Sequence, residues 1–334
     1  MTGVQTCALP IFATLAIDKH SSADIVEEML NEDRKMLEAV RRERERIAVG
    51  VEMIAAALRK GGRIVFVGAG TSGRLGILES AEMPPTFGTE PENIQAVMAG
   101  GRDAIFAAKE GVEDHYEEGA RAVSRLRPSK KDIVIGVSAS GMTQFVRGAL
   151  TIARKVGARI IFVTCDPGTE LQTFVDLTIA PGVGAEVIAG STRLKAGTAT
   201  KLVLNMLTTG AMIRTGKTYG NLMVDVQTGS EKLKDRARRI VNIVTGLEYD
   251  EADRLLKVAH WNVKAAIVMQ KTGLSYTKAL SRLRKAHDSM REALGEDIEP
   301  RLRGLLQGHA EAAAVANEFS TVKAGDDSTR RRRS

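Results

Sequence analysis

The chain has 334 residues, 43% of them hydrophobic and only 4% aromatic, with a formal net charge of +7. This length is sufficient for one large domain with its own core and a smaller appendage. Four of the excess positive charges lie in Arg330 to Arg333, so the rest of the chain is nearly balanced. A nucleic-acid-binding face requires clustered Lys and Arg with stacking aromatics, and therefore nucleic acid is not an expected partner.

The numbers and positions of cysteine and histidine limit which cellular compartment and which metal sites are expected. Cys7 and Cys165 are too few for a disulfide framework, which predicts a cytoplasmic protein. Five scattered histidines show no metal-ligand spacing, so we expect no metal. No apolar run reaches the length of a membrane span, and no membrane partner is expected. The first dozen residues, MTGVQTCALPIF, lack the basic region of a secretory signal and look foreign to the rest of the chain.

The N-terminal two thirds of the chain alternates between strand and helix patterns. Residues 21–60 show helical spacing until Gly61 and Gly62 stop the run. Strands are then predicted at 63–67, 94–98, 132–137, 159–164 and 176–180. Helices are predicted at 72–82, 103–110, 115–126, 143–155 and 192–215. This alternation predicts an α/β fold, a parallel sheet flanked by helices in three αβα layers.

After Gly220 the pattern becomes helical throughout. Helices are predicted at 230–246, 250–258, 260–271, 275–284 and 287–294. We therefore expect an N-terminal segment over 1–20, a large domain over 21–229 and a small all-helical unit over 230–300, which serves packing or partner contact. Residues 301–334 are expected to form a helical extension and a disordered basic tail, because the last residues are rich in Asp, Ser and Arg.

Two loops of small residues each connect an apolar strand to a helix. They lie in IVFVGAGTSGRLGIL (64–78) and IVIGVSASGMTQFVRGAL (133–150). The unpaired N–H groups and the positive dipole end of a helix start favour an anion. The two loops predict a phosphate-bearing substrate contacted by Gly70, Thr71, Ser72, Ser138, Ser140, Gly141 and Thr143. The alternative is two ordinary turns with N-capping hydroxyls.

Nucleotide sites fit the first loop less well. Gly68, Gly70 and Gly73 satisfy the spacing G-x-G-x-x-G. However, a dinucleotide site also needs an acidic residue after the second strand, a role that Glu90 and Glu92 fill only awkwardly. No P-loop motif is present, so a P-loop NTPase is not expected.

Four ordered blocks connect the chain to a known family. They are VGAGTSGRLGILESAEMPPTFG (67–88), EGVED (110–114), VGAEVIAGSTRLKAGTATKLVLNM (183–206) and GKTYGNLMVDVQ (216–227). In these blocks the chain resembles the N-acetylmuramic acid 6-phosphate etherases of the sugar isomerase (SIS) superfamily. The resemblance implies a SIS-type fold, a homodimer and no cofactor. It also implies a carbon–oxygen lyase that converts N-acetylmuramic acid 6-phosphate into N-acetylglucosamine 6-phosphate and D-lactate in cell-wall amino-sugar salvage.

The implied reaction needs two acid–base groups. Eliminating an ether at C3 of an open-chain sugar requires a base for the C2 proton and an acid for the departing lactate. The resemblance implies Glu82 and Glu113. If Pro84 and Pro85 end its helix, Glu82 lies at the negative dipole end, which favours its protonated form and a role as acid. Glu113 is then the candidate base, although which carboxylate performs which step stays open.

The third block supplies further candidates for the substrate. Ser191, Arg193 and Lys195 stand near the start of a predicted helix, within possible reach of a phosphate or the lactyl carboxylate. Glu186 is a candidate for holding sugar hydroxyls or for completing the site of a neighbouring subunit.

The chain also departs from the family pattern. Met142 stands where the family usually has Arg, which removes a charge-assisted donor and puts substrate preference in doubt. Glu79 to Pro85 read E-S-A-E-M-P-P instead of D-A-S-E-C-P-P, so the packing around Glu82 is expected to differ. Two other functions remain open, a non-catalytic sugar-phosphate regulator and an aldose–ketose isomerase of the same superfamily.

Overall fold

The structure is a computed structural model that describes residues 9–307. Cys7, most of the foreign-looking N-terminal segment and the basic tail lie outside the described residues. The chain forms two compact units that divide between Thr215 and Gly216. No helix among residues 9–307 is long and apolar enough to cross a bilayer.

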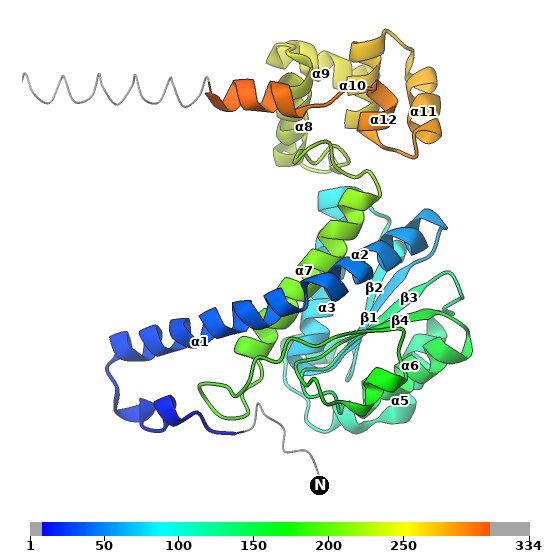
Figure 1. Ribbon diagram of the computed structural model, residues 1–334. Coiled ribbons are helices and arrows are strands. Elements are labelled where there is room, and N and C mark those ends of the chain that lie inside the picture. Colours follow the sequence, from blue (N-terminus) through cyan, green and yellow to red (C-terminus); the bar gives the residue numbers. More distant parts are fainter. Residues whose placement is uncertain (1–8, 308–334) are drawn as a thin grey trace, which may run out of the picture. The chain divides into compact units, whose positions relative to one another are not determined.

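The first unit is built on one parallel sheet, as the strand pattern predicts. Its strands are β1 (Ile64–Gly68), β2 (Ile94–Met98), β3 (Ile133–Val137), β4 (Arg159–Val163) and β5 (Leu177–Ile179). They lie in the order β2-β1-β3-β4-β5, as Figure 1 shows. Ile64 pairs with Ile94 on one side and Ile133 on the other. All residues of β1 and β3 are buried, because a parallel sheet requires both faces to be covered.

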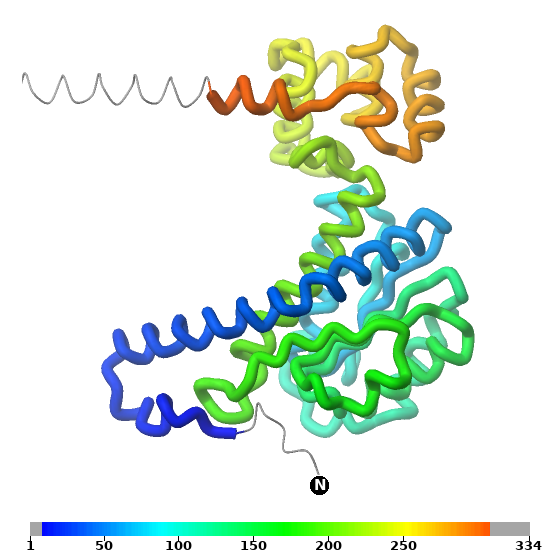
Figure 2. The backbone as a smooth tube through the Cα atoms, in the orientation of Figure 1, coloured from blue at the N-terminus to red at the C-terminus, as the bar shows by residue number. Residues whose placement is uncertain are grey.

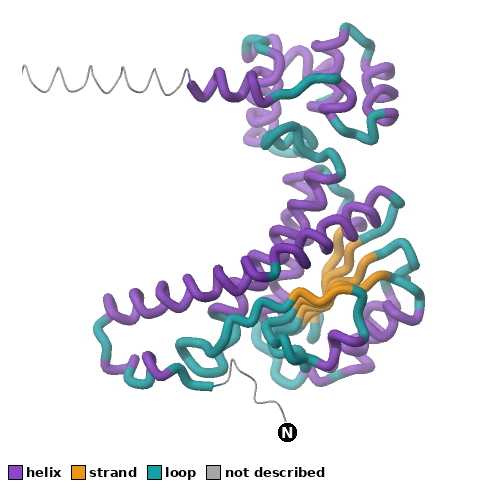
Figure 3. Tube along the Cα trace, viewed as in Figure 1, coloured by secondary structure: helices purple, strands orange, loops and turns teal. Residues whose placement is uncertain are grey.

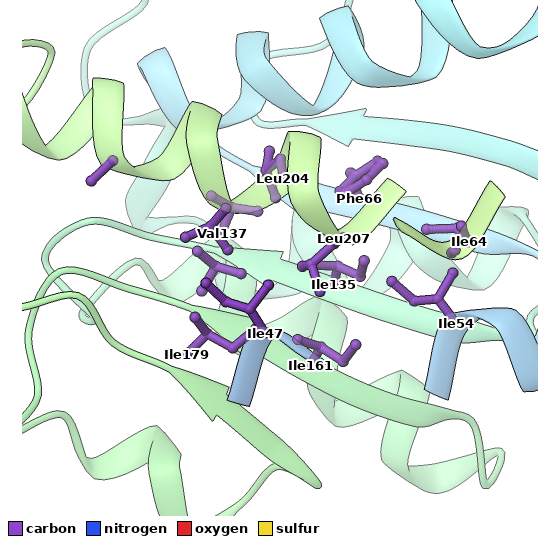
Figure 4. Close-up of a cluster of buried hydrophobic side chains, with 14 of the residues drawn as sticks. Ile47, Ile54, Ile64, Phe66, Ile135, Val137, Ile161, Ile179, Leu204 and Leu207 are labelled. Carbon is purple, nitrogen blue, oxygen red and sulfur yellow. The ribbon is translucent and has the colours of Figure 1, made fainter. Parts of the chain in front are cut away.

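Helices cover both faces of this sheet, which confirms the predicted three-layer αβα fold (Figure 3). One face packs against α1 (Ser22–Arg42), α2 (Arg44–Arg59), α3 (Gly70–Phe87) and α7 (Lys195–Arg214). Figure 4 shows Ile54 of α2 and Leu207 of α7 over Phe66, Ile135 and Ile161 of the strands. The other face packs against α5 (Tyr116–Arg125) and α6 (Gln144–Lys155).

The helical run predicted over 21–60 is two helices, interrupted at Glu43. Figure 2 shows that the chain continues in nearly the same direction through the break. Glu43 has left the helical conformation, with φ −85° and ψ 3°. Its carboxylate accepts a hydrogen bond from Ala180 N–H at 3.1 Å. This hydrogen bond links the break between α1 and α2 to the residue that directly follows β5.

Pro84 and Pro85 lie inside α3, so the prediction that they end this helix is wrong. The helix ends at Phe87, and left-handed Gly88 donates its N–H to Pro84 O at 3.0 Å. The two prolines remove two intrahelical hydrogen bonds. Because of this local cost, the sequence predicts that the helix ends there. Met83 and Phe87, each 5% exposed, pack into the core and hold the last turns. Glu82 is therefore not at the negative end of the dipole, whose effect is confined to the last turn.

The helix predicted over 103–110 is the single turn α4 (Asp103–Phe106). Ala107 has extended backbone angles, which end it. The segment lies between Gly101 and Gly111, both in the left-handed region with φ values of 68° and 75°.

The second unit is all-helical, as predicted. It contains α8 (Glu231–Thr245), α9 (Tyr249–Val258), α10 (Val263–Thr272), α11 (Tyr276–Lys285) and α12 (Met290–Leu294) around a core of their own. Residues 299–307 are also helical. Tyr219, Val224 and Val226 are buried in this core. Asp225 accepts a hydrogen bond from buried Lys264 at 2.8 Å and forms an ion pair with Lys217 at 2.8 Å. The unit thus begins before residue 230, the start we expected.

Candidate functional site

A cavity of about 290 Å³ opens where β1 and β3 end. From β1 the chain moves to β2 on one side and then to β3 on the other, so the carboxyl ends of β1 and β3 flank a topological switch point. Open α/β sheets bind ligands at such points. The cavity is lined by Gly70, Thr71 and Ser72, by Ser138, Ser140 and Thr143, by Glu113, and by Thr192, Gly197 and Thr200, among others. The structure thus brings both predicted loops together.

The first loop presents the start of α3 to the cavity. A Cβ on Gly68 would lie 2.7 Å from Gly73 N, so only glycine lets the first turn of α3 approach the end of β1. Ala69 is the N-cap and offers no side-chain oxygen to the helix. The first N–H groups of α3 therefore have no intrahelical or side-chain acceptor, which is the arrangement that an anion requires.

The second loop presents hydroxyl groups beside the start of α6. Ser138 Oγ and Thr143 Oγ1 lie 2.8 Å apart and share a hydrogen bond. Thr143 is the N-cap of α6 but makes no capping bond with its side chain. Gly141, at φ 71°, contacts Thr169, whose hydroxyl donates to Gly141 O at 3.0 Å. The alternative that both loops are simply side-chain-capped turns does not fit, because neither N-cap side chain accepts from its helix.

Glu113 is the predicted catalytic carboxylate that lines this cavity. It belongs to the short 3-10 turn Val112–Asp114, which follows left-handed Gly111. Its side chain is half-buried. The turn packs against α6, the helix whose N-cap Thr143 also lines the cavity. Glu113 is therefore placed to face a ligand held by the two loops.

Glu82, the other predicted catalytic residue, does not line the cavity. It is exposed on α3, twelve residues beyond Gly70. At 1.5 Å per residue this places it about 18 Å along the helix axis from the end that meets the cavity. Within one chain, the structure does not bring Glu82 and Glu113 together.

Glu186 and Lys195 are engaged elsewhere in the structure. Glu186 is fully buried, and its carboxylate accepts the N–H groups of Lys195 and Ala196, both at 3.0 Å, at the start of α7. Lys195 is 2% exposed, and its Nζ lies 2.5 Å from Glu32 Oε2 of α1. Both side chains thus make contacts that position the start of α7.

Ser191 and Arg193 lie in the turn before α7 and are not among the residues that line the cavity. From this block, Thr192, Gly197 and Thr200 form the wall instead. These three residues carry no charge, and the sequence prediction for this block had favoured its charged side chains. Their small size and their spacing around the helix start were the sequence features that could have indicated that they line a ligand site.

Met142 lies at the edge of the second loop and is 63% exposed. Its N–H donates to Ser140 Oγ at 3.4 Å. The side chain offers no charge to a substrate, as expected from the sequence.

The ion pair between Lys195 and Glu32 favours the charged form of the Glu32 carboxylate. Burial alone raises the pKa of the Glu32 carboxyl, but the hydrogen bonds from Lys195 and Lys35 and their positive charges outweigh it. The pKa of Glu32 is therefore lowered from its ordinary value of 4.5. Because Lys195 is also the first residue of α7, this pair connects α1 to the cavity wall.

We expect Glu32→Gln to lower the free energy of unfolding by about 3 kcal/mol, because it leaves the buried ammonium group of Lys195 without a counter-charge. Urea unfolding measures the change. The control is Glu38→Gln on the same helix, whose exposed pair with Arg41 at 3.8 Å contributes less than about 1 kcal/mol. A double variant, Glu32→Gln with Lys195→Met, should be less destabilised than Glu32→Gln alone. Equal losses in Glu32→Gln and Glu38→Gln would contradict this assignment.

The same pair predicts a pH dependence. Since the pKa of Glu32 is lower in the folded than in the unfolded protein, its contribution to stability is complete above the ordinary value of 4.5. It is lost as pH falls through the folded pKa, because the unfolded state takes up the proton first. The difference in unfolding free energy between wild type and Glu32→Gln should therefore shrink as the pH falls below 4.5. A difference that stays constant down to acid pH would contradict the prediction.

The chain is similar to known proteins over most of its length. A family model described as glucokinase regulatory protein N-terminal SIS domain matches residues 46–154. An N-acetylmuramic acid 6-phosphate etherase of Clostridioides difficile strain 630 is 46% identical over 281 residues, 84% of this chain and 92% of that protein. N-acetylmuramic acid 6-phosphate etherase 2 of Vibrio cholerae is 45% identical over 286 residues, 86% and 93% of the two chains. Among solved structures, a phosphoheptose isomerase from Francisella tularensis has 19% identity and a TM-score of 0.46, covering 58% of this chain and 100% of that one.

Proposed function

Because this chain belongs to the N-acetylmuramic acid 6-phosphate etherase family, we propose that it cleaves the D-lactyl ether of that sugar phosphate to give N-acetylglucosamine 6-phosphate and D-lactate. One structural observation carries the proposal. Two uncapped helix starts rich in hydroxyls and a half-buried carboxylate line the same cavity.

The phosphate is held by the two loops. The N–H groups at the starts of α3 and α6 and the hydroxyls of Thr71, Ser72, Ser138 and Ser140 are the donors. The start of α7 is not available, because the carboxylate of Glu186 already occupies its N–H groups. Binding of the phosphate at the first two helix starts leaves the sugar chain directed toward Glu113.

The reaction is an elimination followed by a hydration. In the open-chain sugar, the C1 carbonyl acidifies the C2 proton, and Glu113 takes this proton as the C3–O bond breaks. The departing lactate oxygen takes a proton from an acid, for which Glu82 is the candidate. Water then adds across the C2–C3 double bond: its oxygen bonds to C3 while the carboxylate left on Glu82 takes one of its protons, and Glu113 returns its proton to C2. Each bond broken is thus balanced, and no electron transfer is needed.

A homodimer in the cytoplasm is part of this proposal. Several large apolar side chains are exposed on α1, α3 and α7, which supports association through these helices: Val26, Leu30, Leu37, Leu78, Met206 and Ile213. Glu82 lies on α3 one turn beyond Leu78. In the dimer, Glu82 reaches the cavity of the second copy and completes a site that one chain leaves without it.

The alternative function is a non-catalytic sugar-phosphate regulator. The match to the glucokinase regulatory protein SIS domain favours it, and so does the absence of Glu82 from the cavity of a single described chain. The purified protein should be incubated with N-acetylmuramic acid 6-phosphate while D-lactate is assayed. Release of D-lactate supports the lyase, and calorimetric binding of the sugar phosphate without any release supports the regulator.

A further inference from the structure

One wall of the cavity is a short segment with little packing of its own. Residues 101–110 contribute Ala104, Ala108, Lys109 and Glu110 to the lining, and Glu113 follows directly. The segment contains only the single helical turn α4, too short to be stable alone. Ala104 is buried, but Phe106 is 85% exposed. The segment also contains an ion pair between Lys109 and Asp103 at 3.0 Å, which is largely exposed and therefore weak.

Arg74 of α3 holds this segment in place through hydrogen bonds to its main chain. Its Nη2 donates to Ala104 O at 2.8 Å and to Ala107 O at 3.3 Å, and its Nε donates to Ile105 O at 2.9 Å. These carbonyls belong to the end of α4, where the last C=O groups have no intrahelical donor. A planar guanidinium can serve several such acceptors at once, which an ammonium group cannot do with the same geometry.

We propose that Arg74 is a positioning residue of the etherase site, which fixes the wall segment 101–110 across the cavity beside Glu113. Although Arg74 also lines the cavity, its Nε and Nη2 donors are directed to main-chain oxygens. It therefore acts through the segment and not as the ligand of the phosphate. This inference rests on the proposed function only for its effect on turnover, because the ordering of the segment is independent of the reaction.

Hydrogen exchange with mass spectrometry on the full-length protein tests the ordering directly. In Arg74→Met, the amides of Ala104, Ile105 and Ala107, which are bonded within the segment, should exchange about tenfold faster or more. Exchange in β1 and β3 should stay unchanged. Arg102→Met is the matched control, because it removes an exposed arginine from the same segment. Unchanged exchange at residues 104–107, or an equal increase in the control, would overturn the proposal.

Turnover supplies the second measurement. For Arg74→Met, kcat/KM for D-lactate release should fall about 10- to 100-fold, as expected when a site wall is misplaced. Arg74→Lys should recover only part of this loss. Guanidinium ions at millimolar concentration should partly restore Arg74→Ala, whereas sodium ions should not. Loss of turnover with normal exchange would instead make Arg74 a ligand of the substrate. A wild-type protein that releases no D-lactate would refute the etherase function and leave the exchange result to decide the role of Arg74.

Discussion

Replacing Glu113 with glutamine should lower the rate of D-lactate release about 100- to 10,000-fold, the usual contribution of a positioned general base. Glutamine keeps the size of the side chain but cannot accept the C2 proton. Glu113 is half-buried in the cavity wall, so the variant should keep the fold. The measurement is a coupled D-lactate assay under saturating substrate.

The control for Glu113→Gln is Asp114→Asn. Asp114 is the next residue, exposed and not among those that line the cavity. Asp114→Asn should release D-lactate at the wild-type rate. Glu113→Gln should still bind N-acetylglucosamine 6-phosphate by calorimetry, because the phosphate contacts lie on the two loops. A wild-type rate in Glu113→Gln would exclude Glu113 as the base.

Mixing two inactive variants should restore activity if Glu82 serves the cavity of the second subunit. Glu82→Gln and Glu113→Gln should each be nearly inactive alone. In a mixed dimer, one site combines the intact Glu113 of one chain with the intact Glu82 of the other, and the second site has lost both. Random exchange of subunits places about half of the chains in mixed dimers, so the activity should recover to about a quarter of the wild-type value.

Two results would contradict this arrangement. If the mixture stays inactive although native mass spectrometry with one variant isotopically labelled shows mixed dimers, Glu82 does not act across the subunit boundary. If Glu82→Gln alone is fully active, another group protonates the departing lactate. Glu90→Gln is a suitable control, because Glu90 is also an exposed carboxylate just beyond α3 and should leave the rate unchanged.

The elements of the fold follow closely from the sequence. All five strands lie close to their predicted positions. The signal is most continuous in β1 and β3, because their side chains are buried on both faces of the parallel sheet. Helix ends were less predictable. Pro84 and Pro85 are local signals for a helix end, and the burial of Met83 and Phe87 overrides them.

The loops of the site were also predictable, and the roles of the charged residues were not. Small and hydroxyl-bearing residues between a strand and a helix indicate a tight strand-to-helix loop, which is a local feature of the sequence. The partner of Lys195 is Glu32, which lies 163 residues away in the chain. No spacing rule connects such a pair, so the sequence alone did not show that Lys195 and Glu186 make contacts at the start of α7.

The order of strands and helices and the two hydroxyl-rich turns follow from the sequence, since each depends on neighbours within a few residues, whereas the two carboxylates were identified only through the family resemblance. Only the tertiary structure decided which side chains share the cavity. It placed Glu113 there, left Glu82 on an outer helix surface and turned Arg74 toward the wall segment. The physical reason is that burial and charge pairing depend on contacts between distant segments, which exist only once the helices have packed on the sheet.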